Sequence, residues 1–261
     1  MRIALIGDLH FVSPDDPSCR WRERRRHFAE AWPSFARTVA LLREESPDLV
    51  VFLGDLVDYY SDENRDFALN QLDALKVPWL VTPGNHDFSP AAETDDTAPE
   101  CPDPDEVRRR WAARGVAMGN RSVDADGVRL LLVDSPDSSV PEGTADWMRA
   151  ETEGSARNVL ITHVPLNTPE MADYILSVEP RRDLRKYVQS KAPTLFDDAV
   201  RGRVEAVFSG HLHFPGHVQV DATAMHLLPL GLCASGKAYR GQGRICLLDT
   251  SEKNSPVRIR E

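Results

Sequence analysis

The sequence predicts an α/β fold in which two packed, mixed β-sheets are flanked by helices. In the first third of the chain, short apolar runs alternate with amphipathic stretches, which is the pattern of βαβαβ units with parallel strands. After His217, several short strand candidates follow one another without a long helix between them. Parallel βαβ units early in the chain and consecutive strands late in the chain favour two sheets packed face to face, with the helices on the outside.

The elements of the first third can be placed from their apolar spacing. Short apolar runs predict buried strands at Arg2–Ile6, Asp48–Leu53 and Pro78–Val81. Apolar residues at helical spacing predict helices over Arg24–Glu45 and Phe67–Leu75. Each strand is followed by a polar cluster, at the end of the sheet where open α/β folds bind their ligands.

The remaining two thirds carry weaker signals. The proline-rich, acidic stretch Ser89–Asp105 predicts a surface loop, and helical segments are expected at Asp146–Glu151 and Thr194–Val200. Strands are expected at Arg129–Val133, Asn158–Thr162, Glu205–Ser209, His217–Val220, His226–Pro229, Gly243–Leu248 and Val257–Ile259. No repeat or linker interrupts this order, so residues 1–261 are expected to form a single domain.

Length, composition and charge restrict the function. The chain has 261 residues, of which 41% are hydrophobic and 28% charged, values of a globular protein rather than a disordered or fibrous one. Its net charge of −10 repels polyanions, which disfavours broad binding of nucleic acid. No apolar run approaches the roughly 20 residues of a membrane span, and the N-terminus lacks an apolar signal core. A cytoplasmic protein is expected, with its four scattered cysteines as free thiols.

Polar clusters at the ends of predicted strands carry most of the chemistry. They hold five of the eight histidines, so histidine is concentrated there rather than spread along the chain. A lone His or Asp beside a strand is usually structural, whereas several such clusters at strand ends indicate a common site. The clusters are Gly7-Asp8-Leu9-His10, Gly54-Asp55-Leu56-Val57-Asp58, Gly84-Asn85-His86-Asp87, Thr162-His163 and Gly210-His211-Leu212-His213.

The residue types in these clusters indicate metal binding. Asp8 and His10 lie two residues apart, so on an extended strand end their side chains can point the same way and bind one ion. His211 and His213 share this spacing. Carboxylate, imidazole and amide ligands suit Mn, Fe or Zn. The candidate ligands are too many for one octahedral centre that must also hold water and substrate. Two divalent ions sharing a carboxylate, roughly 3.5–4 Å apart, are therefore expected.

The ordered blocks GDLH, GDLVD, GNHD, TH and GHLH resemble those of the calcineurin-like metallophosphoesterase superfamily over residues 7–213. The resemblance implies a four-layer αββα sandwich, in agreement with the fold predicted above. It also implies two metal ions bridged by one carboxylate. The first ion would be held by Asp8, His10, Asp55 and His213, and the second by Asp55, Asn85, His163 and His211.

The resemblance implies that His86 and Asp58 are the catalytic residues. The His of the GNH block faces the scissile phosphate in this family, where it stabilises charge or protonates the leaving oxygen, and it binds substrate together with Asn85. Asp58 matches the second acid of the GDxxD block, which pairs with that His in some members. The implied reaction is in-line attack by a metal-bridging hydroxide, with both ions and His86 neutralising the phosphoryl oxygens.

Two departures narrow the class of substrate. Protein Ser/Thr phosphatases of the superfamily follow GDxxD with Arg-Gly and use GNHE, whereas this chain has Tyr59, Tyr60 and Asp87 at those places. The GHLH block looks like that of the bacterial cyclic-nucleotide phosphodiesterase-like branch. We therefore expect a phosphodiesterase or phosphomonoesterase that acts on a small phosphorylated molecule, with a nucleotide as the favoured class.

Two other functions are compatible with the same fold. A non-catalytic scaffold for protein binding would typically lack some ligands or the catalytic His, and none is missing here. A DNA-end nuclease would need a groove that tolerates a polyanion and usually a capping domain. This chain has a net charge of −10 and little length beyond the core.

Several weaker features leave two interpretations open. The Arg20–Arg26 run could clamp a phosphate over the site or be the solvated start of a helix, and the basic run Arg181–Lys186 has the same alternatives. Tyr59 and Tyr60 could line the substrate pocket or pack in the core. The Gly231–Gly243 segment could be a flap beside the cleft or a plain hairpin loop. A structural role is expected for the histidines outside the blocks, His27, His217 and His226.

Overall fold

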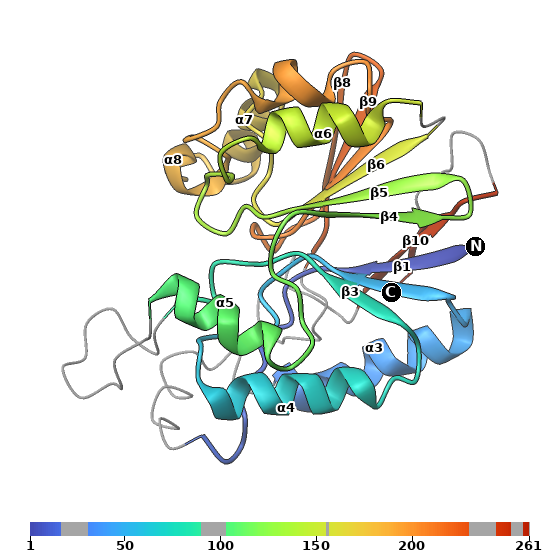
Figure 1. Ribbon diagram of the computed structural model, residues 1–261, viewed down its shortest axis with the longest axis vertical. Helices are drawn as coiled ribbons and strands as arrows, with labels where there is room; N and C mark the ends of the chain where they lie inside the picture. Colours follow the sequence, from blue (N-terminus) through green and yellow to red (C-terminus); the bar gives the residue numbers. More distant parts are fainter. Residues whose placement is uncertain (17–30, 90–102, 155–156, 230–243, 252–257, 261) are drawn as a thin grey trace.

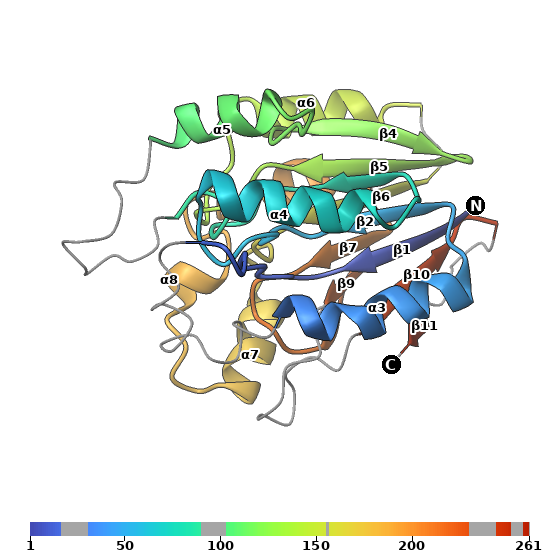
Figure 2. The same ribbon diagram turned by 90° about the horizontal axis from the view of Figure 1, so that it is seen from below.

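Two mixed β-sheets lie face to face at the centre of the molecule, and helices cover their outer faces (Figures 1 and 2). The computed structural model describes residues 1–16, 31–89, 103–154, 157–229, 244–251 and 258–260. This architecture confirms the predicted α/β fold of two packed sheets flanked by helices.

The first sheet contains the N-terminal strands. Its strands are β1 (Arg2–Ile6), β2 (Leu49–Phe52), β3 (Trp79–Val81), β10 (Ile245–Asp249) and β11 (Arg258–Arg260). Their order is β11-β10-β1-β2-β3, with β1, β2 and β3 parallel and β10 antiparallel to β1. Strand β2 is buried along its whole length, as expected of a central parallel strand that is covered on both faces.

The second sheet contains the middle and late strands. They are β4 (Arg121–Ala125), β5 (Val128–Val133), β6 (Asn158–Thr162), β7 (Ala206–Ser209), β8 (Gly216–Val220) and β9 (Thr223–Leu227). Their order is β4-β5-β6-β7-β9-β8, in which β5, β6, β7 and β9 are parallel, while β4 and β8 pair antiparallel at the two edges.

The helices form the two outer layers (Figure 1). Those packed on the first sheet are α3 (Ala31–Glu45), α4 (Asp62–Asp73) and α5 (Pro104–Ala112). Those packed on the second sheet are α6 (Thr144–Thr152), α7 (Pro169–Val178), α8 (Leu184–Tyr187) and the π-helical turn η1 (Phe196–Val200).

Apolar side chains fill the space between each pair of layers. The central layer joins the two sheets and contains Leu5 and Val51 from the first sheet and Ile161 and Phe208 from the second. Each of these four side chains is inaccessible to solvent. The two outer layers join each sheet to its own helices, and Trp111 of α5 is fully buried in one of them. Burial of this kind contributes most of the free energy that stabilises the fold.

The structure contains elements that the sequence did not predict. Strand β4 was missed because it is an edge strand whose side chains are mostly half-exposed, which leaves little apolar signal. Helix α5 begins inside the stretch expected to be a loop. Asp103 caps it and Pro104 occupies its first turn, so the proline starts a helix instead of breaking one. Helix α7 begins in the same way, with Thr168 as its cap and Pro169 in its first turn.

Some predictions fall outside the described residues. They concern the Arg20–Arg26 run, the Gly231–Gly243 segment, most of the loop expected over Ser89–Asp105, and the start of the helix predicted from Arg24. Among the four cysteines only Cys246 lies within the described residues, where it is a buried free thiol. Within the described residues, no helix has both the length and the apolar character needed to cross a membrane.

The carboxyl ends of the parallel strands of both sheets meet on one side of the molecule (Figure 1). The loops after β1 and β2 are joined there, because the amide of His10 donates to the carbonyl of Asp55 at 2.8 Å. The loop after β7 is tied to the loop after β6, because Gly210 N donates to the carbonyl of His163 at 3.1 Å. A further bond crosses between the sheets, from His211 N to Oδ1 of Asp8 at 2.9 Å. These bonds fix the loops that carry the polar clusters.

Candidate metal centre

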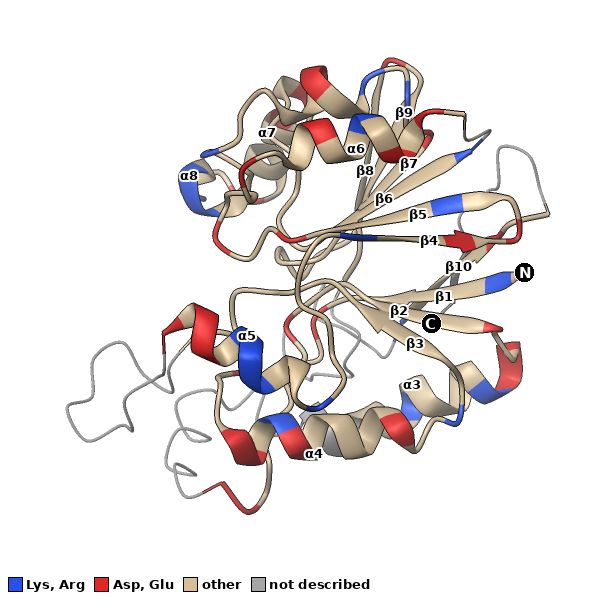
Figure 3. Ribbon diagram, viewed as in Figure 1, with Lys and Arg blue, Asp and Glu red and all other residues tan. Residues whose placement is uncertain are grey.

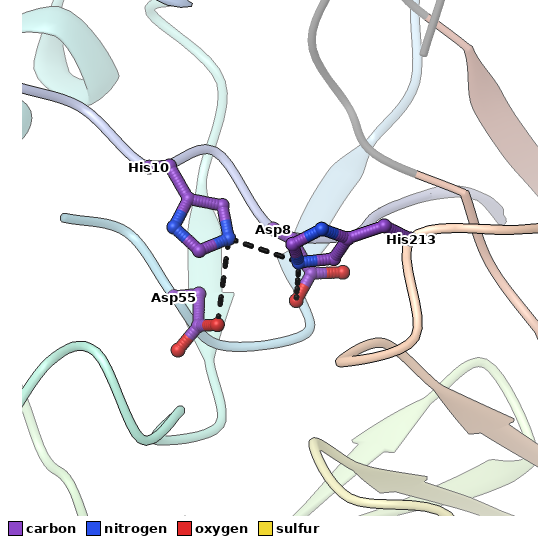
Figure 4. Close-up of side chains that lie close together, drawn as sticks. All are labelled: Asp8, His10, Asp55 and His213. Atoms are coloured by element: carbon purple, nitrogen blue, oxygen red, sulfur yellow. Dashed lines mark hydrogen bonds and ion pairs between the residues drawn. The ribbon is translucent and has the colours of Figure 1, made fainter. Parts of the chain in front are cut away.

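A first cluster of potential ligands consists of Asp8, His10, Asp55 and His213 (Figure 4). Nε2 of His10 lies 3.1 Å from Nε2 of His213 and 3.5 Å from Oδ2 of Asp55. Nε2 of His213 lies 4.0 Å from Oδ1 of Asp8. Two imidazole nitrogens and two carboxylates that converge in this way form a cage in which one atom of each residue faces a common point.

A second cluster lies beside the first and shares Asp55 with it. It consists of Asp55, His163 and His211. Nε2 of His163 lies 3.4 Å from Oδ2 of Asp55 and 3.2 Å from Nδ1 of His211. The amide oxygen of Asn85 joins this group, 3.1 Å from the same Nε2. Oδ2 of Asp55 therefore lies between the two clusters, where one atom can serve both.

Two carboxylate oxygens at the centre of these clusters are buried and accept no hydrogen bond. They are Oδ2 of Asp8 and Oδ2 of Asp55. The other oxygen of each carboxylate is held by a backbone amide, Asp8 Oδ1 by His211 N at 2.9 Å and Asp55 Oδ1 by His86 N at 2.8 Å. A buried carboxylate oxygen without a partner is costly, and a cation removes that cost. The oxygen and imidazole donors present here fit divalent Mn, Fe or Zn.

The backbone at the clusters adopts an unusual conformation. Five candidate ligands have φ in the left-handed region, namely Asp8 (40°), His10 (48°), Asp55 (51°), His211 (68°) and His213 (63°). This conformation is uncommon for residues other than glycine and costs about 1 kcal/mol or more at each position. Because each of these five residues carries strain, the rest of the fold must hold them in place.

Two glycines leave room for these side chains. A Cβ atom at Gly84 would lie 2.2 Å from both N and Oδ1 of Asp55. At Gly54, where φ is +87°, it would lie 2.6 Å from Nδ1 of His163. The glycines that open the GDLVD and GNHD blocks are thus required because the shared carboxylate and its neighbouring ring pass against the bare backbone.

Hydrogen bonds to the outer nitrogens set the tautomer of two rings. Nδ1 of His163 donates to the carbonyl of Leu53 at 2.7 Å, which leaves Nε2 directed at the second cluster. Nε2 of His211 donates to the carbonyl of Lys186 at 2.9 Å, which leaves Nδ1 directed there. A carbonyl oxygen can only accept, so in its neutral form each ring presents its basic nitrogen to the cluster.

Asp58 and His86, the two residues expected to be catalytic, lie next to the first cluster. Nδ1 of His86 donates to the backbone carbonyl of Asp58 at 2.6 Å, while the Asp58 carboxylate lies 3.6 Å from that nitrogen. The same carboxylate lies nearer, at 3.2 Å, to Nδ1 of His10. The sequence-based expectation paired this acid with His86. In the structure the backbone of Asp58 orients His86, and its carboxylate mainly orients His10.

Asp87 is a residue whose contribution the sequence analysis missed. Its Oδ1 accepts from the amides of Leu56 and Val57 at 2.8 and 3.3 Å, and its Oδ2 accepts from Gly84 N at 2.9 Å. The fully buried carboxylate thereby joins the GDLVD loop to the GNHD loop. The sequence did contain a signal for this role, namely an acid that directly follows Asn85 and His86 close to a predicted buried strand. A buried acid needs hydrogen-bond partners, so this position indicates a structural carboxylate.

Burial keeps three of the imidazoles neutral. Burial is the main cause that lowers the pKa of all three rings. The pKa of His10 is lowered, that of His211 falls to about 3, and that of His213 lies well below its usual range. A neighbouring ring adds to the effect in each case. Neutral imidazole is the form that binds a metal ion, so these rings need no deprotonation before they can act as ligands.

The buried acids and His163 shift one another's pKa strongly. Burial raises the pKa of Asp8 to about 8, with His163 opposing. Burial also acts against the charged forms of Asp55 and His163. For Asp55, the neighbouring His163 and His86 outweigh burial and hold the pKa well below its usual range. For His163, Asp55 and Asp8 outweigh it and raise the pKa to about 9. A divalent cation bound here would neutralise both carboxylates and displace the proton of His163.

The remaining candidates from the sequence have other surroundings. Tyr59 and Tyr60 are buried, and their hydroxyls donate to Asp16 at 3.0 Å and to Asp62 at 2.8 Å, so both pack in the core.

The basic run Arg181–Lys186 lies next to Tyr187, which contacts the second cluster. The Tyr187 ring is 5.2 Å from the ring of His211. The guanidinium of Arg182 stacks on the Tyr187 ring, 4.1 Å from its centre.

A sequence model of the calcineurin-like phosphoesterase family matches residues 1–215, which include every strand end that carries a candidate ligand. The chain belongs to this family. Calcineurin-like phosphoesterases are hydrolases that use divalent metal ions, and the Asp and His clusters of this chain supply groups that can bind them.

Several proteins similar to this chain are named as phosphodiesterases or phosphatases. The chain is 24% identical over 229 residues to a protein of Fibrobacter succinogenes named probable cyclic nucleotide phosphodiesterase, covering 88% of this chain and 79% of that one. It is 29% identical over 180 residues to the glycerophosphodiester phosphodiesterase GpdQ of Enterobacter lignolyticus, covering 64% of this chain and 58% of that one. A solved dimetal phosphatase from Danio rerio covers 95% of both chains at 16% identity, with a TM-score of 0.60, and shares the fold.

Proposed function

We propose that the protein is a dinuclear metal-dependent phosphodiesterase that acts on a small phosphorylated molecule, with a nucleotide as the expected class. The observation that carries this proposal is the position of Asp55. Its buried Oδ2 accepts no hydrogen bond and lies 3.5 Å from Nε2 of His10 and 3.4 Å from Nε2 of His163. A carboxylate oxygen between two sets of imidazoles is the arrangement needed to bridge two ions.

Each ion has its own set of proposed ligands. The first ion would be held by Asp8, His10, Asp55 and His213, and the second by Asp55, Asn85, His163 and His211. Held by these residues, two divalent ions would lower the pKa of a bound water and draw charge from the phosphoryl oxygens. The chain contributes the geometry, because backbone hydrogen bonds fix the outer oxygens of both carboxylates before any ion binds.

His86 is proposed as the catalytic group that is not a ligand. Its side chain is 19% exposed, so a substrate can reach it. Because Nδ1 donates to the carbonyl of Asp58, Nε2 is the nitrogen that can accept or donate a proton. At the phosphoester this nitrogen would stabilise charge or protonate the leaving oxygen, and Asn85 would help to bind the phosphate.

Charge and relatives support a small diester as the substrate. The net charge of −10 disfavours a long polyanion, and Figure 3 shows acidic and basic residues intermixed on helices α4, α5 and α6. The names of the relatives from Fibrobacter succinogenes and Enterobacter lignolyticus both describe hydrolysis of diesters. A hydrolysis assay with the bound metal counted alongside distinguishes this proposal from a non-catalytic scaffold.

The test is hydrolysis by metal-stripped protein before and after Mn²⁺ is added. The panel sets bis-p-nitrophenyl phosphate and cyclic nucleotides against p-nitrophenyl phosphate and nucleoside monophosphates. We expect added metal to restore hydrolysis, with diesters preferred. Exclusive hydrolysis of monoesters would contradict the diesterase assignment. Two bound ions without hydrolysis of any member, or no bound ion, would contradict the enzyme assignment.

A further inference from the structure

A pocket of about 440 Å³ opens beside Asn85, next to the candidate metal centre. Its walls come from three segments, namely the loop after β3, the first turns of α5 and the loop after β5. The volume falls in the range of small-molecule sites. Since Asn85 belongs both to this pocket and to the second ligand cluster, an organic group esterified to a phosphate at the centre can extend into the pocket.

Specific contacts hold the three walls together. The Arg108 guanidinium of α5 pairs with both carboxylate oxygens of Asp134 after β5, at 2.7 and 3.1 Å. Nε1 of Trp111 donates to the carbonyl of Asp87 at 3.3 Å, which ties α5 to the loop after β3. Asp134 is itself 4% exposed. The pocket is therefore preformed, and a ligand need not order its walls.

The charges of the pocket are already paired. Arg108 is the sole Lys or Arg among the described residues that line it, and both oxygens of Asp134 occupy this guanidinium. Asp137 at the rim pairs with Lys191 at 3.2 Å. The lining thus offers no surplus positive charge to a second phosphate or a carboxylate, and its two acids disfavour either.

The rest of the lining is apolar and contains an aromatic ring. Phe88 and Val140 face the pocket together with three prolines. Ser89 and Ser139 add two hydroxyl oxygens that can accept, since their protons are donated to the carbonyl of Asn85 and to Asp137. The Arg108 guanidinium lies 4.8 Å from the centre of the Phe88 ring and so fixes that ring in place. A flat apolar wall with a few hydroxyls suits a ring that carries polar atoms but no net charge.

We propose that this pocket determines the substrate specificity of the enzyme by binding a neutral, ring-bearing organic group of the phosphoester, such as a nucleoside. Phe88 and Val140 are the specificity-determining residues. Substrates whose organic group carries a second phosphate or a carboxylate are disfavoured. The inference rests on the proposed function only in that it places the phosphate at the metal centre.

Binding of phosphonates tests the pocket independently of turnover, because these analogues contain no ester bond to hydrolyse. Calorimetry on the metal-loaded protein would compare three probes, namely methylphosphonate, 3-phosphonopropionate and the phosphonate analogue of adenosine 5′-monophosphate. We expect wild type to bind the adenosine analogue about ten-fold or more tightly than the other two. Val140→Trp fills the pocket and should reduce that preference to about two-fold or less, with unchanged binding of methylphosphonate.

Val178→Trp is the matched control, because Val178 lines a different hollow beside α8 and its change should leave the preference intact. Ser139→Tyr is a second variant that fills the pocket, and it is expected to have the same effect as Val140→Trp. Equal binding of the three probes to wild type, tighter binding of the carboxylate probe, or a preference that survives both pocket variants would overturn the inference. If the protein hydrolyses esters but does not prefer the adenosine analogue, only the role of the pocket is refuted. If it prefers the adenosine analogue but hydrolyses no ester, only the proposed function is refuted.

Discussion

The carboxylate of Asp58 lies 3.2 Å from Nδ1 of His10, a candidate metal ligand, and 3.6 Å from Nδ1 of His86. The backbone carbonyl of Asp58 is the group that His86 contacts directly, at 2.6 Å. One residue therefore orients two imidazoles by two different groups. Of the two imidazole contacts made by the Asp58 side chain, the one to His10 is the shorter.

Asp58→Ala should consequently weaken metal binding more than catalysis. The variant loses the acceptor that orients His10 but keeps the carbonyl that orients His86. We expect the affinity for Mn²⁺ to fall by about 10- to 100-fold, the usual effect of removing a group that holds a ligand. At saturating Mn²⁺, kcat should stay well above that of His86→Ala. Unchanged affinity together with the kcat of His86→Ala would show that the carboxylate acts on His86.

His86→Ala should retain both ions and lose rate. His86 is proposed to act on the phosphoester rather than on an ion, so its removal should lower kcat by about 10² to 10⁴-fold. Elemental analysis of the purified variant would be compared with steady-state kinetics on bis-p-nitrophenyl phosphate. A variant that loses its ions along with its activity would show that His86 is a ligand, an option that its place in a cluster with His10 and Asp58 makes worth testing.

Gly84→Ala should disturb the shared carboxylate. The added Cβ would stand 2.2 Å from Oδ1 of Asp55, so either the carboxylate or the loop must move, at a cost of about 1–3 kcal/mol. Metal affinity and thermal stability should both fall. Gly119→Ala is the matched control, since a Cβ there meets nothing within 4 Å. Equal behaviour of the two variants would argue against close contact at Gly84.

The sequence allowed the ligand blocks to be found, because each follows a strand that has a clear apolar pattern. Strand β1 has the bounds that its apolar run predicts. The pocket beside Asn85 could not be predicted in the same way. It depends on the contact of Arg108 with Asp134, which joins a helix that begins at the end of a proline-rich stretch to a residue 26 positions further along the chain. The two roles of Asp58 were also out of reach, since they depend on how its backbone turns.

His226 should make stability fall in mild acid. Its ring stacks on Phe208 at 5.0 Å, and burial, aided by His217, lowers its pKa to about 4. The unfolded chain, with a His pKa of about 6.5, then binds more protons between roughly pH 6.5 and 4. The stabilising effect of the neutral ring is therefore present above pH 6.5 and is lost as the pH falls through that window, by up to about 3 kcal/mol.

The measurement is urea unfolding at pH 7 and pH 4.5, for wild type and for His226→Phe. The substitution keeps an aromatic ring against Phe208 but removes the proton-binding group. The variant should lose less stability than wild type on acidification. Parallel losses in the two proteins would show that His226 does not contribute to the acid sensitivity.

If Asp55 holds two ions in one site, the number of ions bound per chain must be two. Metal-stripped wild type and Asp55→Ala would be titrated with Mn²⁺, and bound metal per chain determined by elemental analysis, with hydrolysis of bis-p-nitrophenyl phosphate followed in parallel. We predict two ions per wild-type chain, activity that follows their uptake, and loss of both binding and activity in Asp55→Ala. A single ion in wild type, or near-normal activity in Asp55→Ala, would contradict the dinuclear centre.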